Sequence, residues 1–191
     1  MLRLYKVLRK LPGETFMRKF WWIDAYYTPF VRIERGGFRN RDVRDIAPEN
    51  NTVSRVVPQL IASTPVELER LAALFTEKGY KEADFNMGCP FPLVARKHKG
   101  SGILPYPAEV EALLKELTHY PELSFSVKMR LGWESADEWR PLLPLLNAAP
   151  CGGSFCIRVS GSNSTKERWT WLRSPLSMRS ARIRWYITAI Y

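Results

Sequence analysis

Strand-like and helix-like segments alternate through residues 22 to 150, and this alternation limits the fold more than any other feature. Four strands are expected, at Ile23–Phe30, Val56–Ser63, Ala83–Met87 and Leu123–Met129, because these segments are apolar, β-branched or alternating in polarity. Helix-like segments follow them. Short strands that alternate with longer helices form βαβ units and a parallel sheet. The sequence therefore predicts an α/β fold, either a barrel or a doubly wound sheet.

The helix expected after the second strand has the most complete set of local signals. Thr64 is expected to cap it, Pro65 stands at its first position, and Glu67 follows the cap by three residues, which is a capping box. Apolar residues at helical spacing give it one buried face, and Gly79 is expected to end it. A further helix is expected at residues 107–119.

Three parts of this region have weaker signals. Pro58 lies inside the second expected strand, where a residue without an N–H is unfavourable. Residues 31–53 are charged and rich in Arg, Asp and Asn, so they are expected to form a long surface loop. Ser135 and Glu138 have the spacing of a capping box at the start of another helix, and two prolines are expected to limit the length of that helix.

Length and composition narrow the class of protein. The chain has 191 residues, fewer than the roughly 250 of a typical (β/α)8 barrel. It has no apolar run long enough to span a membrane and no apolar stretch typical of a secretory signal at its N-terminus. Its 3 cysteines are too few and too irregular for a disulfide framework or a zinc site. A cytoplasmic protein without membrane or metal partners is expected.

The net charge of +10 is concentrated at the two ends. Residues 1–21 carry +5, residues 22–150 carry −1 and residues 151–191 carry +6. The middle is therefore an ordinary near-neutral globular sequence, and both ends are basic without any helical or strand period. We expect three parts: an aberrant N-terminal segment, a catalytic core and an aberrant basic tail.

The candidate chemistry follows the third strand. The sequence EADFNMGCPFP places Asn86, Gly88 and Cys89 directly after it, at the C-terminal edge of a parallel sheet. In a barrel this edge carries the active site. Cys89 is thus placed for acid/base or nucleophilic work, although a lone cysteine is more often a small buried apolar residue.

Three motifs in order carry a family resemblance. VVPQLIAS, then NMGCP, then SVKMRLGW about forty residues later resemble the signatures of the tRNA-dihydrouridine synthases. The resemblance implies an incomplete TIM (β/α)8 barrel of the flavin-oxidoreductase type, with FMN as cofactor and NADPH or NADH as reductant. It also implies tRNA as partner, and we expect a monomer.

Two other functions stay open. Other flavin barrels, including the dihydroorotate dehydrogenases, carry a similar Asn-x-x-Cys-Pro turn and would act on a small pyrimidine. A non-enzymatic basic RNA-binding protein that binds through its ends is a rival from another class, and the even charge of the middle argues against it.

The resemblance also implies roles for five residues. Cys89 matches the family's acid, Gln59 its flavin-ring contact and Lys128 its basic residue at the flavin. A cation there stabilises a reduced, anionic ring. Asn86 is the candidate to hold the uracil edge and Arg130 to contact substrate or phosphate. Alternatively, the two basic residues form one polar strand face, the glutamine satisfies backbone groups and the asparagine caps a turn.

The loop RKHKGSG, at residues 96–102, follows the family's cysteine position. Its four basic or potentially basic residues could contact the tRNA backbone. The alternative, a solvated loop with turn glycines, is equally consistent with the sequence, because the segment lacks interleaved aromatic residues.

Both ends depart from the family. The family begins with a strand ending in an AP-x-x-G-x-T pattern, and after the Lys strand it has a His-containing strand and an N-G-D turn; none of these is present as written. If each end is read one base out of phase, permitted codons supply all three. The hypothesis is a synthase reading frame bracketed by two frameshifts, near residues 21 and 150, with the flanking segments outside the barrel and the activity of this chain impaired.

Overall fold

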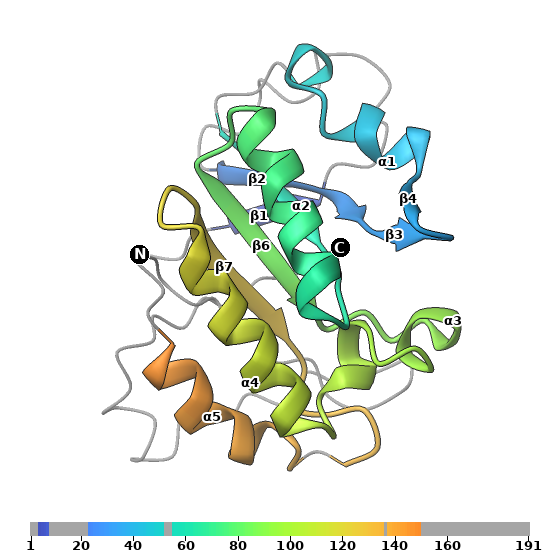
Figure 1. Ribbon diagram of the computed structural model, residues 1–191, viewed down its shortest axis with the longest axis vertical. Coiled ribbons are helices and arrows are strands. Elements are labelled where there is room, and N and C mark those ends of the chain that lie inside the picture. The colour runs from blue at the N-terminus through green and yellow to red at the C-terminus, as the bar shows by residue number, and fades with distance from the viewer. Residues whose placement is uncertain (1–3, 8–22, 52–54, 136, 150–191) are drawn as a thin grey trace.

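Five parallel strands form the main sheet of the computed structural model, which describes residues 4–7, 23–51, 55–135 and 137–149 (Figure 1). Their spatial order is β1-β2-β5-β6-β7, and every neighbouring pair is parallel. The strands are β1 Leu4–Val7, β2 Ile23–Val31, β5 Val56–Leu60, β6 Glu82–Met87 and β7 Ser124–Met129.

The strand order distinguishes between the two predicted architectures. Spatial order follows chain order throughout, whereas a doubly wound sheet reverses its order at a switch point. Three helices, α2 Pro65–Glu77, α4 Pro107–Glu116 and α5 Trp139–Ala148, lie side by side over one face of this sheet (Figure 1). A sheet wound in one direction with helices on one face is a segment of a (β/α)8 barrel wall. The predicted α/β fold and incomplete barrel are confirmed.

The hydrophobic core lies between the strands and these helices. Every second residue of each strand points toward the helices, because side chains alternate across a strand. Fully buried side chains from both layers fill the space, among them Leu60, Leu71, Phe75, Phe85, Met87, Leu113 and Met129. The remaining residues of each strand point to the opposite face, which is the inner face of a barrel. None of the helices in the described ranges is long and apolar enough to cross a membrane.

The local signals of α2 are confirmed. The Thr64 hydroxyl accepts a hydrogen bond from the Glu67 backbone N–H at 3.3 Å. The Glu67 carboxylate accepts from the Ser63 backbone N–H at 2.9 Å, one residue before the cap. Gly79, with φ of +79°, follows the C-cap residue Lys78. This is the left-handed conformation in which glycine ends a helix.

We expect Thr64→Ala to lower the free energy of unfolding by about 0.5–2 kcal/mol, because it removes the side-chain acceptor of an orphan helix N–H. Urea denaturation of wild type and variant measures the difference. Thr118→Ala is the matched control, since Thr118 is exposed and lies in a 3-10 turn, η4 Leu117–His119, outside any helix cap position. An equal loss in both variants would remove the capping argument.

A β-bulge accommodates Pro58. The register of β2 against β5 shifts between Tyr27 and Phe30, so that two residues of β2 stand opposite Pro58. The backbone N–H of Gln59 donates to the Thr28 hydroxyl at 3.1 Å instead of to a ladder carbonyl. A bulge is one of the places where proline is tolerated in a sheet.

The prediction of a long loop at residues 31–53 is wrong. A small hairpin, a short helix and a 3-10 turn occupy most of the segment, at β3 Ile33–Glu34, β4 Gly37–Phe38, α1 Asn40–Asp45 and η2 Pro48–Asn50. Arg35 and Gly36 both have positive φ, 51° and 77°, as a tight two-residue hairpin turn requires.

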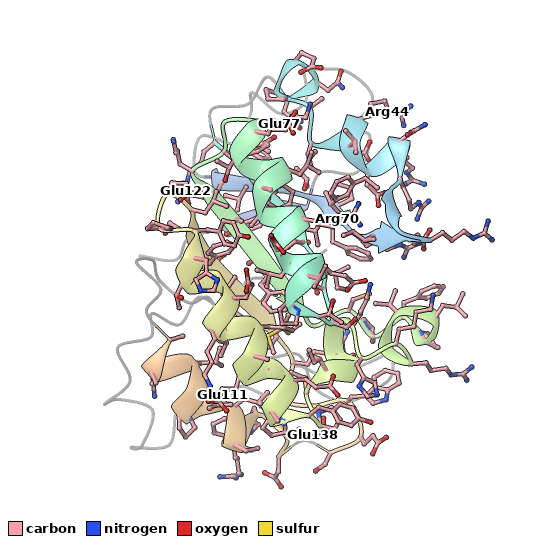
Figure 2. All side chains as sticks on the ribbon, viewed as in Figure 1. Arg44, Arg70, Glu77, Glu111, Glu122 and Glu138 are labelled. Carbon is pink, nitrogen blue, oxygen red and sulfur yellow. The ribbon has the colours of Figure 1, made fainter. Side chains whose placement is uncertain are left out.

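A side chain of α2 holds this hairpin. The Arg70 guanidinium donates to the Gly36 carbonyl at 2.9 Å and lies 5.4 Å from the centre of the Phe38 ring (Figure 2). These contacts come from residues more than thirty positions later in the chain. Local composition therefore did not reveal them.

The start of α5 is partly as predicted. The Glu138 carboxylate accepts backbone N–H bonds from Glu134 and Ser135, both at 2.8 Å, but the Ser135 hydroxyl accepts from the Asp137 N–H at 3.3 Å, so the predicted capping box does not form: Glu138 itself is the N-cap residue and no side chain caps the helix. Glu138 is labelled in Figure 2. The helix itself begins at Trp139 and continues through Pro144.

Four residues of the N-terminal segment differ from expectation. Residues 1–21 were expected outside the barrel, but β1 pairs in parallel with β2 along the edge of the sheet. An extended backbone can satisfy the N–H and C=O groups of an edge strand whatever its side chains. The rest of that segment and the predicted tail at 151–191 lie outside the described residues.

Candidate functional site

The inner face of the sheet is polar at the ends of β5, β6 and β7. Along β6, Phe85 and Met87 belong to the helix-side core, so Asp84 and Asn86 point the other way. Asn86 stands directly opposite Lys128 of β7 in the register. Residues paired across neighbouring strands lie on the same face. The structure thus brings Asn86 and Lys128 together.

Hydrogen bonds join this face into one network across three strands. The Gln59 side-chain amide donates to Asp84 Oδ2 at 2.6 Å, and the Ser126 hydroxyl donates to Asp84 Oδ1 at 2.8 Å. The Asn86 amide donates to Gln59 Oε1 at 3.4 Å. Gln59, Asp84 and Asn86 are each no more than 3% exposed. Such deeply buried polar groups persist because each one is satisfied by another.

Cys89 lies three residues after Asn86 of this network, and hydrogen bonds to the backbone hold it. The Gly88 N–H donates to Asn86 Oδ1 at 3.1 Å, and the Arg130 guanidinium donates to the Gly88 carbonyl at 2.7 Å. On the other side, the Ser101 N–H and hydroxyl both donate to the Cys89 carbonyl at 3.0 Å. Cys89 is a free cysteine of intermediate exposure. Hydrogen bonds on both sides therefore fix the backbone that carries its side chain.

The loop at residues 96–102 supports Cys89, and two of its basic residues have partners within the protein. The loop follows α3 Pro92–Ala95, and its 3-10 turn, η3 Gly100–Ile103, packs against β6 (Figure 1). Lys99 is 7% exposed, with its Nζ 2.6 Å from Glu67 Oε1. His98 lies 3.0 Å from the Glu109 carboxylate and stacks on Tyr106. The alternative of a solvated loop is therefore wrong for Lys99, whereas the His98 side chain is 39% exposed and Arg96 and Lys97 lie on the surface.

We expect Gly100→Ala to be destabilising by about 1–3 kcal/mol more than Gly79→Ala, because it adds a clash to an unfavourable backbone conformation. Both glycines have positive φ, but a Cβ at Gly100 would lie 2.6 Å from the Cys89 carbonyl oxygen, while a Cβ at Gly79 meets nothing within 4 Å. Chemical denaturation of the two variants isolates the clash. The rate of Cys89 alkylation should also change only in Gly100→Ala.

The five residues predicted from the sequence end on one face or at its rim. Gln59, Asn86 and Lys128 lie on adjacent strands, and Cys89 and Arg130 follow the ends of β6 and β7. Amide, ammonium and guanidinium donors in one place suit a ligand with ring carbonyls, ring nitrogens and a phosphate. FMN has all three, so the residues present fit the cofactor that the resemblance implies.

Asp84 and Ser126 were missed by the sequence analysis. The signal was present, because polar residues at 84 and 86 alternate with apolar ones along a strand that would otherwise be buried on both faces. A buried carboxylate at the centre of such a network is a usual mark of a functional site. Within the described residues no three His, Cys, Asp or Glu side chains gather as a metal site would require.

Comparison with known proteins identifies the family. Residues 9–159 match the family model described as dihydrouridine synthase (Dus). The chain belongs to the dihydrouridine synthase family. The match contains the predicted core at 22–150 and extends beyond it at both ends. All five candidate residues of the synthase site lie inside it.

Individual relatives agree with this assignment. The chain is 34% identical over 124 residues to a probable tRNA-dihydrouridine synthase 2 of Bacillus subtilis, covering 63% of this chain and 37% of that protein. It is 36% identical over 122 residues to a probable tRNA-dihydrouridine synthase of Staphylococcus epidermidis, with the same coverage. It is 37% identical over 103 residues to tRNA-dihydrouridine synthase B of Klebsiella pneumoniae, covering 54% and 32%. The chain matches only about a third of the length of these synthases.

Proposed function

We propose that this chain is the catalytic core of a tRNA-dihydrouridine synthase, which reduces uridine in tRNA to 5,6-dihydrouridine with FMN and NADPH or NADH. The family match and the names of the relatives support the reaction class. One structural observation carries the proposal to this site: a free, partly exposed cysteine whose backbone is held by hydrogen bonds follows the end of β6, next to a buried polar network on the inner face.

Cys89 acts as the acid in this proposal. FMN, when bound, supplies a hydride to C6 of the uracil ring. The resulting carbanion at C5 takes the proton of the Cys89 thiol, so that one hydride and one proton together saturate the double bond. Ser101 holds the Cys89 carbonyl, and Asn86 and Arg130 hold the preceding Gly88, so the backbone that presents the thiol is fixed. In this proposal Cys89, which is partly exposed, recovers its proton from solvent.

The other residues bind and orient. Gln59 and Lys128 are assigned to the flavin, where a cation stabilises the reduced ring. Asn86 is assigned to the uracil edge, since a base taken out of the stack is recognised by hydrogen bonds. Arg130 is assigned to substrate or phosphate, and it also positions the turn before Cys89 through the Gly88 carbonyl.

A reduction assay on tRNA tests this function. The protein expressed from the gene with both proposed frameshifts restored, the frame-restored synthase, is mixed with FMN, NADPH and unmodified tRNA. Dihydrouridine is measured by mass spectrometry as a gain of two hydrogens per reduced base. We expect reduction of tRNA and none of orotate. Turnover of orotate instead would favour a dihydroorotate dehydrogenase-like enzyme, and RNA binding without any reduction would favour a basic RNA-binding protein.

We also propose that residues 1–21 and 151–191 are read out of frame. Their basic, aperiodic composition and the three family motifs recovered in a single alternative phase support this. Because the family match begins at residue 9 and ends at 159, the proposed changes of frame lie inside the matched range. In that case the site described above belongs to a longer synthase, and this chain holds only part of it.

A further inference from the structure

Asp84 occupies the centre of the inner-face network, and neither the family motifs used above nor the proposed roles give it a function. Its carboxylate accepts from side chains of both neighbouring strands, Gln59 of β5 and Ser126 of β7. It is 2% exposed. An ionised carboxylate can only accept hydrogen bonds, so it acts on its neighbours by choosing which of their groups faces it.

The choice matters for Gln59, because a side-chain amide can present either of two groups. Against an ionised carboxylate only the NH₂ group of Gln59 is favourable, and the 2.6 Å distance is that of a strong, charge-assisted bond. With Nε2 turned to Asp84, Oε1 faces Asn86 and accepts from its amide at 3.4 Å. Asn86 Oδ1 in turn accepts from the Gly88 N–H at 3.1 Å. One carboxylate thus sets the direction of a chain of donors that leads to the residue before Cys89.

The direction of this chain determines what Gln59 and Asn86 can offer a ligand. Each side-chain carbonyl already accepts one hydrogen bond, while each NH₂ group has used one of its two hydrogens. We propose that Asp84 is a positioning residue that orients the Gln59 and Asn86 amides so that their remaining N–H groups face the ligand. The site then selects acceptor atoms, such as the carbonyl oxygens of a flavin or a uracil ring. Only the identity of the ligand in this inference rests on the proposed function; the orientation of the two amides does not depend on it.

The side-chain amide spectrum of the ligand-free protein tests the orientation directly. In ¹⁵N-labelled protein, with the Gln59 signal assigned by its loss in Gln59→Glu, we expect one Gln59 amide proton shifted downfield and slow to exchange. This is the proton donated to Asp84. Asn50, whose amide donates at the exposed surface, is the internal reference. A Gln59 signal with the shift and exchange rate of an exposed amide would overturn the proposal even if no variant folds.

Two substitutions of Asp84 distinguish the effect of its hydrogen-bond acceptor from the effect of its negative charge. Asp84→Asn keeps an oxygen that can accept from Gln59 while its own amide donates to Ser126, so the downfield Gln59 proton should persist. Asp84→Leu has no acceptor, and the proton should move to the position of a free amide. If Asn and Leu behave alike, or if Leu leaves the signal unchanged, the positioning role is wrong. Ser126→Ala, which removes a second hydrogen-bond donor to Asp84, should leave the Gln59 signal in place.

FMN titration then separates this inference from the proposed function. In the frame-restored synthase we expect FMN binding to shift the remaining Gln59 and Asn86 amide protons downfield, and the FMN affinity to fall about tenfold in Asp84→Leu, the cost of one misdirected hydrogen bond. If the frame-restored synthase binds no FMN, the proposed function fails. The amide spectrum still decides the role of Asp84.

Discussion

In the frame-restored synthase, replacement of Cys89 by alanine should lower the rate of tRNA reduction by about 10²–10⁴-fold while leaving FMN binding unchanged, because loss of a positioned general acid costs that much. We expect the loss to appear in kcat, because alanine removes the proton donor but leaves the groups that hold the flavin in place. Single-turnover reduction of tRNA by the pre-reduced enzyme measures the step itself. Oxidation of NADPH without tRNA should be unaffected.

Cys89→Ser is the matched variant. It keeps the size of the side chain and the backbone hydrogen bonds from Ser101, but replaces the thiol by a weaker acid. We expect a rate between those of wild type and Cys89→Ala at neutral pH. An alanine variant that reduces tRNA at more than half the wild-type rate would show that the proton comes from elsewhere.

The elements that could be predicted are those whose signals are local. The cap, the apolar face and the terminating glycine of α2 all lie within sixteen residues, and the structure places the helix where they indicate. The four predicted strands form for the same reason. The segment at 31–53 was misread because a two-residue turn at Arg35 and Gly36, and its anchor on Arg70, leave no pattern in its composition.

The residues of the site also fall into those that local sequence motifs reveal and those that only long-range contacts reveal. Asn86, Cys89 and Lys128 stand in short motifs, so a sequence reveals them. Asp84 acquires its role only when three strands come into register, because its partners are 25 and 42 residues away. The ion pair of Lys99 with Glu67 joins residues 32 apart, so a loop that seems solvated in the sequence turns inward. Composition and residue spacing do not predict contacts between side chains that are far apart in the chain.

Restoring one reading frame across both proposed junctions should have the largest effect of any change to this gene. Within the described residues β7 pairs only with β6, so this part of the chain supplies five adjacent strands of a barrel that has eight. We expect the chain as written to leave tRNA unreduced and to bind no FMN. The frame-restored protein should bind FMN stoichiometrically, seen as a yellow complex with quenched flavin fluorescence, and reduce tRNA.

The control for that experiment is the DNA itself. Sequencing across the codons for residues 15–25 and 145–155 should reveal a single-base error at each junction. If it does, the site residues described here belong to a full-length synthase and their roles transfer to it unchanged. If the frame is confirmed as written and the purified chain nevertheless binds FMN, the frame proposal is wrong. The ends of this chain would then complete the flavin site with residues that do not follow the family's motifs.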